Sequence, residues 1–140
     1  MENSDEDAPL LPKEQSDTLF WLSFLIGFTA IYAFKKNKYD IFVICVIVLI
    51  TSLNHWRDPK FGFRRNIDIF AIIIGFFYIF ARAIILKIDS PIFWIFYIAI
   101  LFIYPFGWYV RYHGYVWDST YIHCLLHLCG NISVILFCGI

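Results

Sequence analysis

Polar and apolar positions along this chain form long separate blocks. A polar, acidic stretch covers residues 1–18, and five apolar blocks follow with short polar connections between them. The blocks span residues 19–34, 39–56, 67–86, 92–109 and 121–140. Soluble folds show alternation or amphipathic periodicity instead. A membrane-spanning helix takes roughly 20 residues, with about 17 as a lower limit. The pattern therefore predicts five transmembrane helices, the first two near that limit.

Composition supports the same class of protein. Of the 140 residues, 61% are hydrophobic, 21% are aromatic and only 16% are charged. A soluble domain of this size has too much surface to hide so many apolar side chains. The net charge is zero, so no basic surface for nucleic acid is expected. We predict an all-α integral membrane helical bundle, with one domain over residues 19–140 and a disordered tail over residues 1–18.

The N-terminal tail contains a motif that predicts where in the cell the protein resides. Glu6, Leu10 and Leu11 resemble an acidic dileucine sorting signal, which cytosolic adaptors read. The motif predicts adaptor binding, a cytosolic N-terminus and an endomembrane location for this multi-pass protein. The basic residues divide six against five between the two sides of the predicted bundle, so the positive-inside rule gives no orientation.

Several polar residues near block ends are expected to meet at one membrane face. His55 ends the second block, Asp68 begins the third, and His123 and His127 begin the fifth. The last two are four residues apart, so on a helix they lie on one side, one turn apart. Thr51 lies one turn before His55. Such groups are costly in lipid and usually face the bundle interior or a cavity.

These residue types suit zinc chemistry. A catalytic zinc site takes three protein ligands and leaves one position for water, and His55, His123 and His127 are the candidate ligands. Bound water then loses a proton near neutral pH and becomes a nucleophile. Asp68 is the candidate general base. A hydroxyl from Thr51, or from its neighbour Ser52, is the candidate group to stabilise a developing oxyanion.

Each residue also has a structural interpretation. His55 beside Trp56 is compatible with an interfacial residue that ends its helix. Asp68 is compatible with a carboxylate that meets the helix dipole at a helix start. The pair of His123 and His127 is compatible with hydrogen bonds to neighbouring helices. The functional interpretation is favoured because three predicted helix ends place metal-compatible side chains at the same membrane face.

The order of these residues resembles the CREST superfamily of membrane hydrolases, which includes the alkaline ceramidases and the progestin and adiponectin receptors. The matching positions lie within residues 51–68 and 121–140, and they are Thr51, His55, Asp68, His123 and His127. This chain departs from the family in two ways. Threonine occupies the usual serine position, although Ser52 is adjacent, and five predicted helices replace seven.

The resemblance implies a function. It implies hydrolysis of an amide bond in a lipid substrate such as a ceramide, through attack of zinc-bound water. A bundle of five helices implies a smaller lipid chamber, or one completed by a second copy in a homo-oligomer. The alternative is a non-catalytic small membrane protein, with a structural zinc or no metal, that acts through partner contacts.

Overall fold

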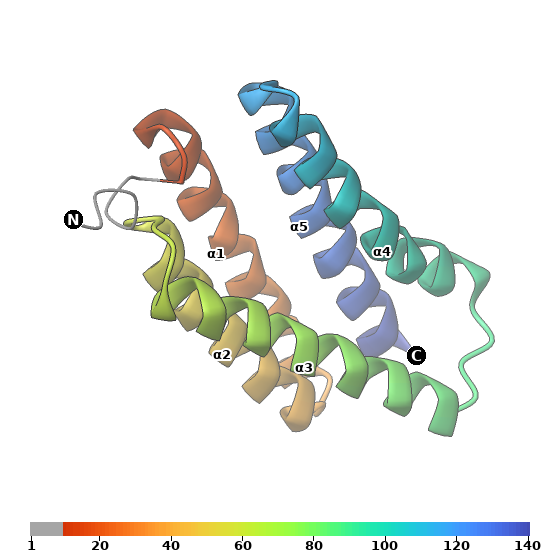
Figure 1. The fold of residues 1–140 in the computed structure, drawn as a ribbon. Coiled ribbons are helices and arrows are strands. Elements are labelled where there is room, and N and C mark those ends of the chain that lie inside the picture. Colours follow the sequence, from red (N-terminus) through yellow and green to blue (C-terminus); the bar gives the residue numbers. More distant parts are fainter. Residues whose placement is uncertain (1–9) are drawn as a thin grey trace.

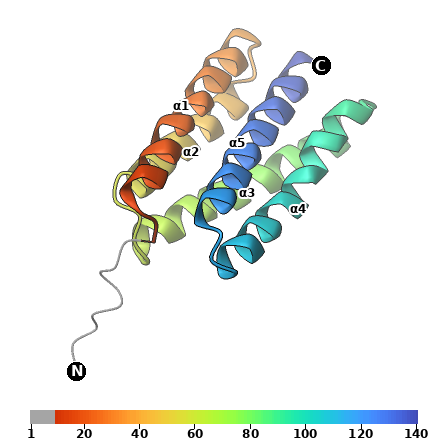
Figure 2. The ribbon, with the colours of Figure 1, turned by 90° about the horizontal axis from the view of Figure 1, so that it is seen from above.

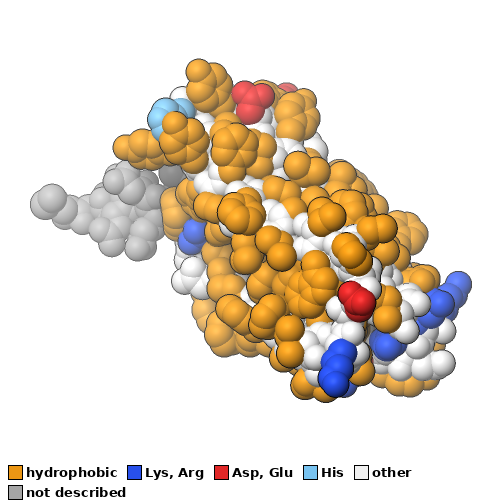
Figure 3. Space-filling model, turned by 90° about the vertical axis from the view of Figure 1, so that its right-hand side faces the viewer, with side chains coloured by type: hydrophobic (Ala, Val, Ile, Leu, Met, Phe, Trp, Pro, Cys, Tyr) orange, Lys and Arg blue, Asp and Glu red, His pale blue; other side chains and the backbone are white. Residues whose placement is uncertain are grey.

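The computed structural model describes residues 10–140 as five α-helices joined by short connections. Their bounds are α1 Lys13–Lys35, α2 Tyr39–Trp56, α3 Phe63–Ile85, α4 Pro91–Tyr112 and α5 Val116–Gly139. All five are long and apolar enough to cross a membrane. The predicted class, an all-α multi-pass membrane bundle, is confirmed. On the face seen in Figure 3, apolar side chains predominate and charged side chains are few.

Three helices begin earlier than the apolar blocks that predicted them. α1 begins at Lys13, α3 at Phe63 and α5 at Val116. The reason is that a helix continues past the hydrocarbon layer, where polar residues are tolerated, whereas a block of apolar residues marks only the part at lipid depth. The predicted disordered tail is therefore wrong for residues 13–18, which are helical. Its residues 1–9 lie outside the described part of the chain.

The helices form two layers. One contains α1, α5 and α4, and the other contains α2 and α3 (Figures 1 and 2). α5 packs between α1 and α4, and α2 packs against both α1 and α3. α3 and α4 approach each other where Tyr97 stacks on Phe76, with ring centroids 4.3 Å apart. Towards the other end α3 and α4 diverge (Figure 1). At this end the guanidinium of Arg65 on α3 lies over the ring of Trp108 on α4, 5.6 Å from its centroid.

Polar contacts hold the ends of the bundle opposite the candidate site. Ser90 caps α4 as its sequence predicted, because its Oγ accepts a hydrogen bond from the backbone N–H of Phe93 at 3.3 Å. Asp40, at the start of α2, accepts a hydrogen bond from the Tyr78 hydroxyl at 2.7 Å and lies 3.3 Å from Nη2 of Arg82. These contacts fasten the start of α2 to the end of α3.

Gly75 allows α2 and α3 to approach closely. A Cβ at this position would lie 2.9 Å from Cγ2 of Ile44, nearer than side chains tolerate. We expect Gly75→Ala to lower the free energy of unfolding by about 1–2 kcal/mol, measured by thermal unfolding in detergent. Gly130→Ala is the control, because nothing lies within 4 Å of a Cβ there and alanine favours the helix. Equal losses in both variants would contradict the close approach.

Candidate functional site

A cavity of about 570 Å³ lies between the helices, and all five of them line it. This volume is within the range of about 300–1,000 Å³ that small-molecule sites occupy. Most of the wall is apolar. Its imidazole, carboxylate and guanidinium side chains are His55, Arg65, Asp68, Arg111, His123 and His127. Five of the six predicted site residues, from three helices, therefore share one cavity, and Thr51 is the one that does not line it.

Asp68 is joined to α2 by two hydroxyl groups. Thr51 Oγ1 donates a hydrogen bond to its Oδ1 at 2.9 Å, and Ser52 Oγ donates to the same atom at 2.7 Å. Asp68 is only 4% exposed, and a buried carboxylate needs such donors. Oδ2 accepts no hydrogen bond from residues 10–140. The three residues that the sequence grouped are thus in contact across α2 and α3.

The interpretation of Asp68 as a helix cap is wrong. α3 begins at Phe63, and its first turn contains no acidic residue. Asp68 lies one turn further along the helix, beyond the reach of the unpaired N–H groups at the start. The hydroxyl groups of Thr51 and Ser52 are directed at Asp68 in this structure. They therefore position the carboxylate, a different role from the predicted stabilisation of an oxyanion.

His55 is buried, with 5% of its surface exposed. His55 lies in the last turn of α2, as its interpretation as a helix-ending residue requires, and its side chain lines the cavity. Its Nδ1 is buried and has no hydrogen-bond partner among residues 10–140. Its ring lies against Trp56, with centroids 4.5 Å apart. A buried imidazole nitrogen without a partner is uncommon in a folded protein, and it requires a ligand or a functional reason.

His123 and His127 lie side by side on α5, with ring centroids 5.2 Å apart, as their spacing predicted. His123 also contacts Trp56 at a centroid distance of 5.1 Å. Neither ring makes a hydrogen bond to any residue in the described range 10–140. The structural interpretation of this pair, hydrogen bonds to neighbouring helices, is therefore not observed there. Asn131 instead bonds the backbone carbonyl of His127, at 2.7 Å.

The donors suit zinc in kind, since imidazole and carboxylate are its usual ligands. In the described part of the chain, however, these side chains do not form a complete zinc site. Within residues 10–140, no three His, Cys, Asp or Glu side chains lie close enough to hold one metal ion. One reason is that α5 begins at Val116, which places His127 about 16 Å along the helix. Trp56 also contacts both His55 and His123.

The segment before α1 packs at the same end of the cavity. Leu11 is 7% exposed and packs with Leu19 and Trp56. The backbone N–H of Leu10 donates to the Pro59 carbonyl at 2.7 Å, and its own carbonyl accepts a hydrogen bond from Arg111. The predicted dileucine signal is thus packed against the bundle, and adaptor binding would require it to detach. Glu6 lies outside the described residues.

The predicted catalytic and metal-binding residues do not include Trp56, Arg65, Trp108 or Arg111. Near the ends of apolar blocks, aromatic and basic residues are typical of interfacial anchors. In the structure all four line the cavity. No signal in the sequence distinguishes a cavity-facing anchor from a lipid-facing one, because the rotation of each helix about its axis depends on its neighbours.

The chain matches no family model, no curated protein and no solved structure. These comparisons therefore do not test the resemblance to the CREST superfamily, which depends only on the order and placement of the five matching positions.

Proposed function

We propose that this protein is a zinc-dependent membrane hydrolase that cleaves an amide bond in a lipid such as a ceramide. One observation carries the proposal: His55, His123, His127 and Asp68 line a single, mainly apolar cavity. Polar groups of this kind inside a membrane bundle usually mark a functional site. The CREST resemblance, which covers the same residues, supplies the class of reaction.

The site residues have different roles in the proposed reaction. The three histidines would hold the zinc ion, which when bound acts as a Lewis acid that makes water nucleophilic at neutral pH. Asp68 would accept the proton of the attacking water through Oδ2, which accepts no hydrogen bond from residues 10–140. Thr51 and Ser52 hold Oδ1 and so orient the carboxylate. The apolar walls bind the lipid chain and limit access of bulk water.

A second candidate is a non-catalytic membrane protein that acts through partner contacts. The observation in its favour is the absence of three converged metal ligands among residues 10–140. In this case the histidines bind a structural zinc after rearrangement, or they bind no metal.

Zinc content, stability and hydrolysis together test the proposal. Full-length protein purified in detergent with zinc present is expected to carry about one zinc ion per chain. A chelator is expected to lower its unfolding temperature, because a metal that binds only the folded state stabilises that state. The chelator is also expected to abolish release of fatty acid from a ceramide, and added zinc to restore it.

The other outcomes favour other functions. Bound zinc with no hydrolysis of any lipid amide would favour the structural role. No bound zinc, together with no effect of the chelator on unfolding, would contradict both metal-dependent functions.

A further inference from the structure

Two arginines that the proposed chemistry does not use line the cavity, one on α3 and one on α4. The guanidinium of Arg65 lies over the ring of Trp108, 5.6 Å from its centroid, and over Phe61 at 5.3 Å. Arg111 follows Trp108 by three residues on α4, so both share one face of that helix. Arg65 and Arg111 therefore line the same cavity from two different helices.

This region adjoins the candidate site. Arg65 precedes Asp68 by three residues, again on one face of a helix. Arg111 donates a hydrogen bond to the carbonyl of Leu10. The next residue, Leu11, packs with Trp56, whose ring contacts His55 and His123. Both arginines thus lie at the end of the cavity that contains the histidines.

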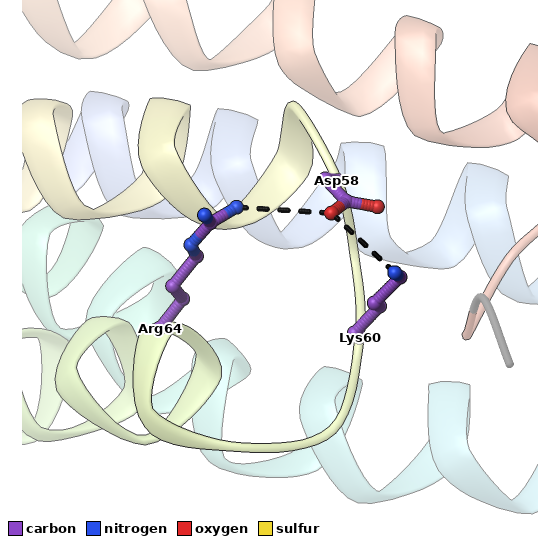
Figure 4. Close-up of polar contacts among 3 residues, drawn as sticks. All are labelled: Asp58, Lys60 and Arg64. Atoms are coloured by element: carbon purple, nitrogen blue, oxygen red, sulfur yellow. Dashed lines mark ion pairs between the residues drawn. The ribbon is translucent and has the colours of Figure 1, made fainter. Parts of the chain in front are cut away.

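Neither arginine has an anionic partner within residues 10–140. Arg65 lies over the rings of Phe61 and Trp108, and Arg111 donates to the Leu10 carbonyl. Two other arginines of the bundle are paired: Arg82 with Asp40 at 3.3 Å, and Arg64 with Asp58 at 3.8 Å (Figure 4). A guanidinium carries five N–H donors, so most of those on Arg65 and Arg111 remain available. Partly buried cations of this kind call for an anion.

We propose that Arg65 and Arg111 bind the phosphate monoester headgroup of a lipid whose apolar chain occupies the cavity. Guanidinium groups bind phosphate through paired, charge-assisted hydrogen bonds. A phosphate monoester carries between one and two negative charges at neutral pH, which matches two arginines better than a single carboxylate does. The inference depends on the proposed function only in taking the cavity as a lipid site.

Arg65 and Arg111 differ in position from arginines that anchor a helix at the membrane surface. Arginines at membrane surfaces generally lie near the headgroups of surrounding lipid. Arg64 is such a residue, because it is exposed and pairs with Asp58 in the connection before α3. Arg65 and Arg111 instead face the cavity. A bound lipid in that cavity, not the bulk bilayer, is their partner.

Binding of matched amphiphiles tests the proposal. The full-length protein, treated with chelator and held in phosphatidylcholine nanodiscs, is given a monoacylglycerol phosphate, a free fatty acid and a neutral monoacylglycerol with the same chain. We expect the phosphate to bind at least about tenfold more tightly than the neutral lipid. Arg65→Gln and Arg111→Gln should each reduce that preference by about tenfold. Arg64→Gln should retain it.

The proposal is overturned if wild-type protein binds the phosphate and neutral lipids equally, a comparison that needs no variant to fold. It is also overturned if Arg64→Gln reduces the preference as much as Arg65→Gln does. Fatty acid binding as tight as that of the phosphate would reject the phosphate assignment. Because zinc and turnover are not needed, a failure to hydrolyse lipid amides leaves this result standing. Hydrolysis without any preference for the phosphate would overturn this inference alone.

Discussion

Alanine at His123 or at His127 is expected to remove both zinc and hydrolytic activity. Each change leaves only one imidazole on α5, and a zinc site held by two remaining ligands binds weakly. We expect zinc to fall from about one ion per chain to nearly none. Hydrolysis of the lipid amide should fall by at least about a hundredfold. Zinc analysis of the purified variants and measurement of released fatty acid check both expectations.

His113→Ala is the matched control. His113 is exposed just after α4, where its Nδ1 lies 2.9 Å from the carbonyl of Tyr109, so it is expected to retain zinc and activity. Thermal unfolding of the chelator-treated proteins separates loss of metal from loss of fold. The rings of His123 and His127 make no hydrogen bond to residues 10–140, so their removal leaves no protein group there unpaired. Zinc retained in both alanine variants would contradict the assigned ligands.

Asp68→Asn is expected to keep zinc and to lose turnover. Asparagine has nearly the same shape, and its carbonyl oxygen can still accept the hydrogen bonds from Thr51 and Ser52. It cannot take a proton from water, so the rate is expected to fall by about 10²–10⁴. Single-turnover kinetics at saturating lipid, with zinc measured on the same sample, distinguish this result from loss of metal.

The controls for Asp68 concern charge and packing. Asp58→Asn removes a carboxylate in the connection before α3, where the side chain is 48% exposed, and it should not change the rate. Asp68→Ala is a poor probe because it leaves the buried Ser52 hydroxyl without its acceptor. If Asp68→Asn is fully active, the carboxylate is not the base. If zinc stabilises the protein but no variant alters a lipid reaction, the structural role gains support.

Local features of the chain were sufficient for several conclusions. The five apolar blocks predicted five helices because lipid solvates no backbone polar groups, so a spanning segment needs a continuous apolar helix. Ser90 before Pro91 predicted the start of α4, and the capping bond is present. The pairing of His123 with His127 follows from helix geometry alone. Each of these depends on residues within a few positions of one another.

Local pattern was insufficient at helix ends. Residues 13–18 are polar and were predicted to be disordered, yet they form the first turns of α1. Gln15 and Ser16 in this segment are buried against the bundle. These residues are helical because they contact distant parts of the chain. A helix that extends beyond the lipid also needs no apolar side chains there. Hydropathy detects neither.

Sequence alone determined the class of protein and which polar residues approach one end of the bundle. Tertiary structure decided how those residues meet. It placed Thr51 and Ser52 on one oxygen of Asp68, and it set Trp56 against both His55 and His123. It also turned two arginines into the cavity. The physical reason is that the rotation and depth of each helix are set by packing against the other four, and no stretch of a single helix contains that information.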